Sequence, residues 1–503
     1  MTRRHWLVLT GLLLLAPTAG AEVPSQFIAK LYSEALGRAP DAGGWQTQTN
    51  YFVTQGCSQA TLSAFASSVF EGAEYTGKGY TPEEAVLTVY RAILSREPDA
   101  SGLAHFAGRI RSGVTAAAVA RDQMVSAEFT GLIGAICAGG AYRQDWNGRQ
   151  AIDLGSGTWS QAQIEACVNN NTVCSIPPRV VVYLSAPLRI PAGRILQTVG
   201  QPGRLSYARQ ARLVRGNGNF GHLIEMGPGA VIRNVWVTGQ RHLYRSIPTA
   251  DGVRANLYYN GGTGGAIRDV RSDFPYQRTH VEASAAAGSL TVDHNLFVNY
   301  TANHLPDGTQ TWVSDGVSNH NPNGTITNNH VIDPTDVGIV IFGHTGMVQA
   351  SSAWGNTIVH AGLSAYGSLV FDTIVCAGCG FTGAIRDNLI LGGRTVHSDI
   401  MLSVGTGPWF TPNCPTGLGC GTGARMTGNS TLWGDANQRL RVQHAIVVDG
   451  MLNADTQGNL LSINPQPLGN CYHGPGVRND SPGHASGNLA LESTGPTHAC
   501  IAH

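Results

Sequence analysis

The stretch SDGVSNHNPNGTITNNHVIDPTDVGIVIFGH, residues 314–344, places many groups that can ionise or bind metal beside a segment suited to burial. It contains three aspartates and three histidines, together with the apolar run GIVIF. Asp315 and Asp336 are 21 residues apart, about one uninterrupted turn of a repeating coil. Strands of neighbouring coils lie about 4.8 Å apart. The sequence therefore predicts that these two carboxyl groups lie side by side.

Three uses of such a pair stay open at this stage. Two like charges about 5 Å apart disfavour double ionisation, so one carboxyl can keep its proton as general acid while the other is base or nucleophile. This is glycosidase chemistry, and the spacing of the carboxyls separates inverting from retaining enzymes. Alternatively, oxygen atoms of Asp251, Asp315, Asp333 and Asp336 can hold Ca²⁺ and neutralise a uronate for elimination. The third use is structural, as caps of turns.

The pair belongs to a longer column of aligned strand starts. The segments TADGVRA, QRTHVEA, VSDGVSN, PTDVGIV, LSAYGS and HSDIML align on Asp251, His280, Asp315, Asp336, Ala365 and Asp399. This alignment predicts His280 as a third catalytic residue. Strict alternation does not place Val317 and Ile339 inward together, which allows a bulge or a one-residue slip.

Other polar and aromatic residues near this column are candidates for substrate binding. Tyr276 and Arg278 precede His280 and suit proton transfer or recognition of an acidic sugar, or they form a loop rim. Trp312 can stack on a sugar ring, and His344 follows the apolar strand. The predicted substrate-binding set is Asp251, Tyr276, Arg278, Trp312, His344 and Asp399. Asp333 is the predicted metal ligand, with Asp315 and Asp336, where calcium is bound.

A repeat with an asparagine in each copy positions this column. The segments VIRNVWVTG, TVDHNLFVNY, TITNNHVID, SAWGNTIVHA, AIRDNLILGG, RMTGNSTLWG, DTQGNLLSIN and ASGNLALES align on Asn234, Asn295, Asn329, Asn356, Asn388, Asn429, Asn459 and Asn488, and AIRDVRSDF fits with Asp269. Spacings of 26–41 residues indicate a short coil with loops of varying length. Asparagine suits a left-handed turn, and stacked amides can hydrogen-bond along a ladder. A β-propeller is the alternative, but it would need longer periods.

These segments, over roughly residues 150–495, resemble right-handed parallel β-helix proteins of the pectate-lyase-like superfamily. The fold implied for residues 150–503 is a parallel β-helix, which by itself fixes no function. The order of Asp315-Gly316, Asp336 and Gly343-His344 looks like that of polygalacturonases. The second aspartate here is single, and the Arg-Ile-Lys motif of that family is absent. Lysine occurs only at Lys30 and Lys78, so a lysine base in the β-helix is excluded.

Residues 24–140 contain a different repeat. FIAKLYSEALGRAPDAGGW and AVLTVYRAILSREPDASGLAHF share Tyr, Leu, Arg, Pro, Asp and Gly at a spacing of 58 residues. Each copy has apolar residues at helical spacing and then breaks at Pro-Asp. The copies resemble an all-helical module of secreted bacterial proteins with an LGRxPDxxG signature, whose role is unknown. We expect the shared Arg and Asp to close a turn as an ion pair, with ligand binding as the alternative.

Composition and the N-terminus indicate the compartment. Residues 1–21 read as a secretory signal peptide, with two arginines, an apolar run and small residues at its end. No other segment is long and apolar enough to span a membrane. With 32 basic and 32 acidic residues, nothing in the charge indicates nucleic-acid binding. The ten cysteines predict disulfides between Cys57 and Cys137, Cys167 and Cys174, Cys376 and Cys379, Cys414 and Cys420, and Cys471 and Cys500.

The sequence thus predicts a mainly β protein with an N-terminal all-α domain, secreted to the periplasm or outside the cell. The expected function is cleavage of a polysaccharide by hydrolysis, with Asp315 and Asp336 as the acting pair. Calcium-assisted elimination or uronate epimerisation, and a non-catalytic adhesin or spike, are the alternatives. The sequence indicates no cofactor other than the Ca²⁺ that the aspartates would bind if the enzyme acts by elimination. Signatures of zinc proteases, serine esterases and nucleotide-binding proteins are absent.

Overall fold

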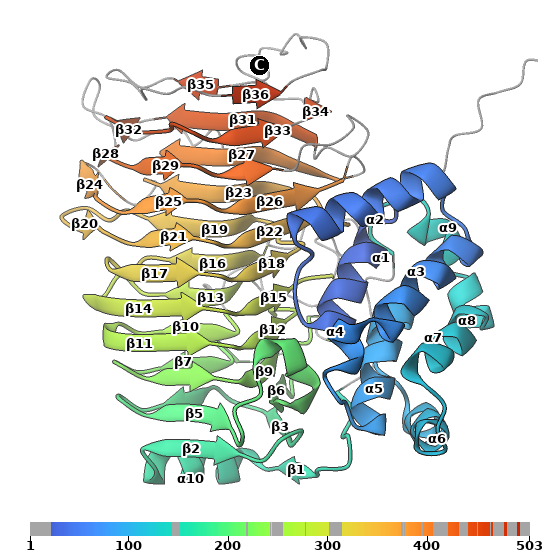
Figure 1. Ribbon diagram of the computed structural model, residues 1–503. Helices are drawn as coiled ribbons and strands as arrows, with labels where there is room; N and C mark the ends of the chain where they lie inside the picture. Colours follow the sequence, from blue (N-terminus) through green and yellow to red (C-terminus); the bar gives the residue numbers. More distant parts are fainter. Residues whose placement is uncertain are drawn as a thin grey trace, which may run out of the picture.

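The computed structural model describes residues 22–142, 151–217, 220–241, 243, 255–276, 278–300, 314–373, 376, 378–393, 396–405, 421–431, 441–449, 451–462, 464–465, 477–479 and 490–492. The predicted signal peptide, residues 1–21, lies outside the described residues. Helices occupy the first part of the chain and parallel strands the second, side by side (Figure 1).

The helical domain consists of short helices, and its two π-helical segments end at left-handed residues, Gly37 and Ser95. Its elements are α1 (Ser25–Lys30), the π-helical segment η1 (Leu31–Leu36), α2 (Ala42–Gln55), α3 (Gln59–Glu71), α4 (Ala73–Thr76), α5 (Pro82–Val89), the π-helical segment η2 (Tyr90–Leu94), α6 (Ala100–Arg111), α7 (Ala116–Met124), α8 (Ala127–Thr130) and α9 (Ile133–Ile136). Several of these helices have an N-cap residue whose side chain bonds to the first turn. Asp41 accepts the N–H of Gly44 at the start of α2, and Thr81 and Glu84 form a capping box at α5.

The residues shared by the two copies build the same turn twice. Arg38 pairs with Asp41 at 3.2 Å and with Glu74 at 2.7 Å. Arg96 repeats this contact with Glu128 at 2.6 Å, and its distance to Asp99 is 3.8 Å. The shared arginines and aspartates therefore close turns within the helical domain.

The second domain is a parallel β-helix, because all the strand pairings among the described residues are parallel and each sheet takes one strand from each successive coil. Sheet A contains β1 (Thr158–Trp159), β3 (Val181–Leu184), β6 (Ala211–Arg215), β9 (Val235–Thr238), β12 (Arg271–Asp273), β15 (Leu296–Val298), β18 (His330–Ile332), β22 (Thr357–His360), β26 (Leu389–Gly392), β30 (Ser430–Thr431), β33 (Leu460–Ser462) and β36 (Ala490–Glu492). Sheet B contains β2 (Val173–Ile176), β5 (Ile195–Thr198), β8 (Val231–Arg233), β11 (Gly262–Arg268), β14 (Gly288–Asp293), β17 (Gly324–Thr327), β21 (Ser352–Trp354), β25 (Ala384–Arg386) and β29 (Arg425–Thr427).

Sheet C carries the aspartate column. It contains β4 (Leu188–Ile190), β7 (Ile224–Met226), β10 (Leu257–Tyr259), β13 (Thr279–Ala283), β16 (Asp315–Asn319), β19 (Val337–Phe342), β23 (Ala365–Asp372), β27 (His397–Gly405), β31 (Arg441–Asp449), β34 (Asn464–Pro465) and β35 (Val477–Asn479). A small fourth sheet holds β20 (Val348–Gln349), β24 (Cys379–Phe381), β28 (Gly421–Thr422) and β32 (Met451–Leu452).

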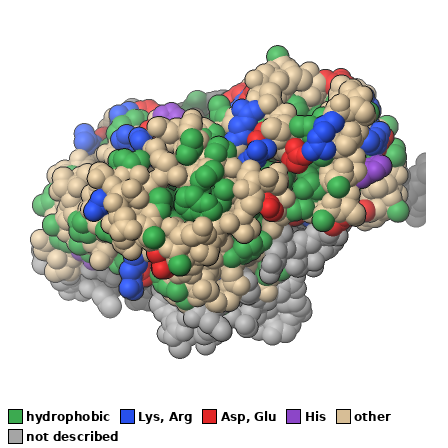
Figure 2. Space-filling view, turned by 90° about the horizontal axis from the view of Figure 1, so that it is seen from below, with side chains coloured by type: hydrophobic (Ala, Val, Ile, Leu, Met, Phe, Trp, Pro, Cys, Tyr) green, Lys and Arg blue, Asp and Glu red, His purple; other side chains and the backbone are tan. Residues whose placement is uncertain are grey.

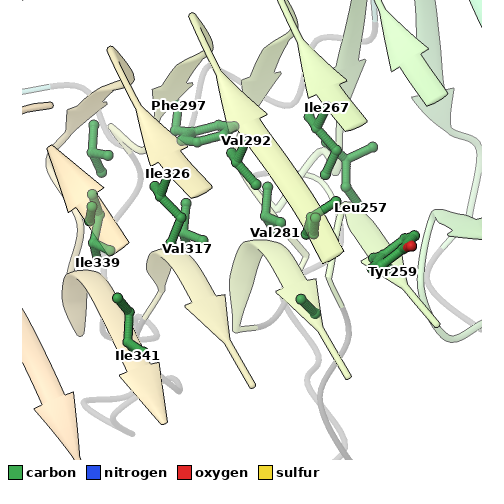
Figure 3. Packing of buried hydrophobic residues seen from close by; sticks show 14 of the residues in the cluster. Leu257, Tyr259, Ile267, Val281, Val292, Phe297, Val317, Ile326, Ile339 and Ile341 are labelled. Carbon is green, nitrogen blue, oxygen red and sulfur yellow. The ribbon is translucent and has the colours of Figure 1, made fainter. Parts of the chain in front are cut away.

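The core of the β-helix is a stack of apolar side chains in register. Leu257, Val281, Val317 and Ile339 pair in sequence across sheet C. Side chains of sheet B and Phe297 of sheet A meet them from the other walls (Figure 3). Each coil thus buries its apolar side chains against its neighbours, as a solenoid requires.

An asparagine ladder supports the turn between sheets B and A. The side-chain amide of each member donates to Oδ1 of the next at 2.9–3.0 Å, through Asn295, Asn329, Asn356, Asn388, Asn429 and Asn459. The left-handed residue is the one before each asparagine, such as His294 with φ 56°. Asn234 and Asp269 themselves occupy that left-handed position, so they align with His294. The sequence alignment of Asn234 with Asn295 is therefore wrong by one residue.

The first coil is closed by an amphipathic helix. Helix α10 (Gln161–Asn170) inserts Ile164 and Val168 into the core stack, which covers the otherwise open end. Figure 2 views the molecule from this side, and there acidic and basic side chains are interspersed over the described surface. Among the described residues, none of the helices has the length and apolar character needed to cross a bilayer.

Three of the predicted disulfides are present. Cys57–Cys137 joins the two halves of the helical domain, and Cys167–Cys174 and Cys376–Cys379 close short loops in the β-helix. The predicted pairs Cys414 with Cys420 and Cys471 with Cys500 involve residues outside the described part of the chain.

The helical domain packs against the outer face of sheet A through a buried charged network. Arg91 contacts Glu34, Glu97 and Asp273 at 2.6–2.7 Å. Arg271 contacts Glu34 at 2.6 Å and Asp273 at 2.8 Å. These side chains are at most 3% exposed. Buried ions of this kind require all their partners, because removal of one leaves an uncompensated charge.

Candidate active site

Asp315 is the first residue of β16, and both of its carboxylate oxygens have partners. Oδ1 accepts the backbone N–H of Val337 at 2.9 Å, and Oδ2 accepts the hydroxyl of Ser318 at 2.5 Å. The residue is 8% exposed. Burial, reinforced by the nearby charge of Asp336, raises the pKa of Asp315 well above its usual range. Burial and the nearby carboxyl therefore favour the protonated form of Asp315, while its two hydrogen bonds act in the opposite direction.

Asp336 directly precedes β19 and is the more accessible member of the pair. Burial raises its pKa to about 6, while the positive charge of Arg278 acts in the opposite direction. Its backbone is fixed between coils, since its N–H donates to the carbonyl of Ser314 and its carbonyl accepts the N–H of Tyr366. A carboxyl that titrates near neutral pH is suited to proton transfer in that range.

The two aspartates lie on adjacent coils but one residue out of register. Val317 pairs with Ile339, which places Asp315 opposite Val337 and leaves Asp336 beside Ser314. This offset is the one-residue slip that the positions of Val317 and Ile339 in the sequence allowed. It lets the backbone N–H that follows Asp336 bond to the carboxylate of Asp315, so the pair is joined through the main chain.

The structure places His280 apart from the pair. Its register partner is Gly316, and its ring lies inside the coil, 1% exposed, with Nδ1 2.9 Å from the hydroxyl of Ser272. The ring also stacks on Phe297 of sheet A. Burial lowers its pKa to about 3. His280 is thus a neutral interior side chain that does not face the carboxyls.

Asp333 does not join the pair as a metal ligand either. It is fully buried, with Oδ1 accepting the N–H groups of Ala361, Gly362 and Leu363 and Oδ2 accepting the amide of Gln26. Both oxygens are therefore occupied by protein donors. Over the described residues, no cluster of three or more His, Cys, Asp or Glu side chains is arranged to hold a metal ion.

The remaining predicted binding residues are distributed unevenly. Arg278 lies beside the pair, since its carbonyl accepts the N–H of Asp315 at 2.7 Å and its charge acts on Asp336. Tyr276 is 2% exposed, and its ring packs under Arg215. Asp251, Trp312 and the side chain of Asp399 fall outside the described part of the structure.

His344 belongs to a hydrogen-bonded array at the far end of the same strands. Nε2 of His344 is 2.8 Å from Nδ1 of His320, and Nε2 of His320 is 3.3 Å from Glu282. His320 stacks flat on Phe342, with ring centroids 4.1 Å apart. At about 3.3 Å per residue along a strand, β19 separates His344 from Asp336 by more than 20 Å. His344 therefore lies at the opposite end of the strand from the pair.

Sequence reasoning missed the residues that link these two ends. Glu282 and Ser318 are register partners, and Ser318 bonds to Asp315. Tyr258 is the next partner of Glu282, and its ring stacks on His222 with centroids 4.1 Å apart. The sequence could have identified these residues through the alternation of side chains along each strand. Tyr258, Glu282 and Ser318 each follow an inward apolar residue and therefore point outward. The result is a polar and aromatic row across β10, β13 and β16, which continues on β19 and β23 as an apolar cluster that contains Val340 and Val370.

Comparisons with known proteins identify one region of the chain. Residues 62–133 match the domain of unknown function DUF4214. No curated protein matches the sequence. Solved structures that resemble it include an alginate lyase from Paenibacillus sp. str. FPU-7, with 12% identity and a TM-score of 0.34 over 64% of this chain and 98% of that one.

Two further solved structures resemble this chain to a similar degree. A family 28 exopolygalacturonase from Yersinia enterocolitica has 11% identity and a TM-score of 0.30, over 65% of this chain and 76% of that one. The A-module of a mannuronan C-5 epimerase from Azotobacter vinelandii has 13% identity and a TM-score of 0.28, over 69% and 97% of the two chains. The function of this chain has to be argued from its own side chains.

Proposed function

We propose that this chain is a secreted enzyme that cleaves a polysaccharide by hydrolysis, with Asp315 and Asp336 as its acid and base. The observation that carries the proposal is the pair itself. One carboxyl is buried with a pKa well above its usual range, and its neighbour on the next coil has a pKa of about 6 and is more accessible. Two carboxyls whose environments separate their protonation states are the requirement of glycosidic hydrolysis.

The roles follow from which carboxyl keeps its proton. We assign the proton to Asp315, whose pKa burial and the charge of Asp336 raise well above its usual range, and the ionised form to Asp336, whose pKa is about 6. Asp315 then donates its proton to the glycosidic oxygen as the bond to the anomeric carbon breaks. Asp336 takes a proton from the attacking water, or attacks the anomeric carbon itself before water does. Because the two groups interact, the pair titrates as a unit and both roles depend on each member.

The outer face of sheet C supports a long substrate. Tyr258 with His222, and His320 with Phe342, are stacked pairs of partly exposed rings two coils apart. Aromatic rings offer flat apolar surface to sugar rings, and the coil spacing of about 4.8 Å is close to the length of one sugar. Arg278 and Glu282 add polar contacts along the same face. A polysaccharide laid along the axis would meet one coil per sugar.

The experiment is incubation of the purified protein with a panel of neutral and acidic polysaccharides. New reducing ends without ultraviolet absorbance of an unsaturated sugar support hydrolysis. The same panel run with the Asp336→Asn variant serves as the control for contaminating activity. No product on any substrate, with intact protein, argues against an enzyme and for a non-catalytic adhesin or spike.

Elimination is the second candidate, and the position of Arg278 favours it. A guanidinium beside Asp336 is placed to neutralise the carboxylate of a uronate, which acidifies the neighbouring C–H bond. An unsaturated product from alginate or pectin would establish this reaction. Inversion at C5 without chain cleavage, measured by proton NMR of the polymer, would instead establish epimerisation.

A further inference from the structure

A single amide of the helical domain reaches the turn that carries the acidic pair. Gln26, in α1, donates from Nε2 to Oδ2 of Asp333 at 2.9 Å. Oδ1 of Asp333 holds the N–H groups of residues 361–363 in the next coil, at 2.6, 2.9 and 3.2 Å. Asp333 has a left-handed backbone, with φ 53°, at the corner between sheets A and C. The helical domain therefore contacts the β-helix at this corner.

The corner is continuous with the acidic pair. Asp333 is three residues before Asp336. Between them, the hydroxyl of Thr335 accepts the N–H of Ser314 at 2.9 Å, and the N–H of Thr335 donates to the carbonyl of Ser314 at 3.0 Å. Ser314 directly precedes Asp315. The turn 333–336 thus fixes the backbone on both sides of the pair.

Gln26 is itself held firmly. It is 1% exposed, and Oε1 accepts the backbone N–H of Tyr142 at 3.1 Å. A methyl group at Gly362 would overlap the Gln26 amide, so only glycine at 362 leaves room for it. An amide with both ends bonded and a closely packed neighbour has little freedom to move away from Asp333.

The contact belongs to one copy of the helical repeat. At the spacing of 58 residues, Gln26 corresponds to Glu84, which instead caps α5 and pairs with Arg209. The copies also differ at Ser33 and Arg91, both of which contact the β-helix. The positions that the copies share close internal turns, while positions at which they differ contact sheet A.

We propose that the helical domain functions as a brace for the active-site coil, with Gln26 as the positioning residue that holds the turn 333–336. This rests on the proposed function only in naming the pair as the active site. The brace keeps Asp336 in the partly buried position where burial and its neighbour act on its charge. The brace lies outside residues 62–133, the part of the helical domain that matches a family of unknown function.

The test is a titration that needs no substrate. Protein labelled with ¹³C at aspartate side chains is titrated by NMR, and the Asp336 signal is assigned from the Asp336→Asn variant. Gln26→Leu removes the donor without changing charge. We expect the midpoint of Asp336 to move down by on the order of half a unit to one unit, because a loosened turn admits water and weakens the burial that raises this pKa.

Arg209→Ala is the matched control. Arg209 bonds to Glu84 and to backbone carbonyls of residues 78 and 79 at the same interface, but it has no bonded path to the turn. It should lower stability and leave the Asp336 midpoint unchanged. Gln26→Asn, which keeps an amide that is too short to reach Asp333, serves if Gln26→Leu does not fold.

Two results would overturn the proposal. One is a Gln26 variant that titrates like the wild type at Asp336 while it loses stability. The other is an equal shift in Arg209→Ala, which would make the effect a general consequence of a weaker interface. Inactivity of the wild type on every polysaccharide would overturn the proposed function, and this titration would still decide the role of Gln26.

Discussion

The carboxylate of Asp315 accepts, at 2.9 Å, the backbone N–H of Val337, the residue that follows Asp336. The bond couples position and charge, because any movement of the strand that carries Asp336 also disturbs a hydrogen bond to Asp315. It also opposes the burial that raises the pKa of Asp315. A pair linked in this way has a fixed geometry before any substrate arrives, which lowers the cost of orienting the reacting groups.

Replacement of either carboxyl should remove activity while preserving the fold. Asp336→Asn deletes the base or nucleophile and Asp315→Asn deletes the proton donor, so each should lower kcat by about 10³-fold or more. The double variant should be little worse than either single variant, since residues that act as a unit are not additive. Near-normal rates in both variants, measured on any polysaccharide that the wild type cleaves, would make these aspartates turn caps.

The pair should also make stability depend on pH in a defined direction. The folded pKa of Asp336 is about 6, above its ordinary value of 3.8, so the folded protein binds this proton more tightly than the unfolded chain. The resulting stability is present below pH 3.8 and is lost as pH rises to about 6. Asp336→Asn should therefore stabilise the protein at pH 8 by roughly 2 kcal/mol.

Urea denaturation of wild type and variant at pH 4 and pH 8 checks this sign. The difference between the two proteins should be small at pH 4, where the wild-type carboxyl is already protonated. A variant that is less stable than the wild type at pH 8 would mean that the ionised Asp336 gains more from Arg278 than it loses by burial.

The repeat in the sequence predicts a solenoid of short coils, and its resemblance to pectate-lyase-like proteins implies the parallel β-helix that the structure has. The ladder asparagines recur because each must bond to the next coil, so they mark the coils even when loop lengths vary. The errors were single-residue slips. His280 and Val281 both point inward, and this double inward step broke the alternation used to align His280 with Asp315, whose register partner is Thr279.

The contacts between the two domains could not be predicted from sequence. Gln26 and Asp333 are 307 residues apart, and Arg91 and Asp273 are 182 apart. A buried glutamine or arginine in a short helix has no periodic signature, because its partner is set by the docking of two separately folded surfaces. Asp333 was therefore assigned as a metal ligand from its proximity in sequence to Asp336, although its oxygens bond to backbone and to Gln26.

The asparagine ladder should be most sensitive to substitution in its middle. Asn356 donates to Asn388, and its Oδ1 accepts both the backbone N–H and the side-chain amide of Asn329. Asn356→Leu would leave these buried groups without partners and should cost about 2 to 4 kcal/mol by thermal or chemical denaturation. Asn171→Leu is the control, since Asn171 is exposed, has an extended backbone and bonds through its side chain to the carbonyl of Cys167. Equal losses in both variants would contradict a specific role for the ladder.

The domain interface should weaken in acid, opposite in sign to the effect of the pair. Burial alone would raise the pKa of Glu34, but Arg271 and Arg91 outweigh it and lower the pKa to about 2. Glu34 thus contributes stability that is present above its unfolded pKa of about 4.5 and is lost as pH falls toward 2. Glu34→Gln should cost about 3 kcal/mol at pH 7, because Arg91 and Arg271 then lose a buried counter-charge. The variant should also lose most of the acid dependence of stability between pH 4.5 and pH 2.

Glu74→Gln is the matched control, since Glu74 makes the same kind of contact with Arg38 at a partly exposed site. This variant should cost no more than about 1 kcal/mol. Equal stability losses in the two variants, measured by denaturation at each pH, would show that the buried network is no more important than a surface ion pair.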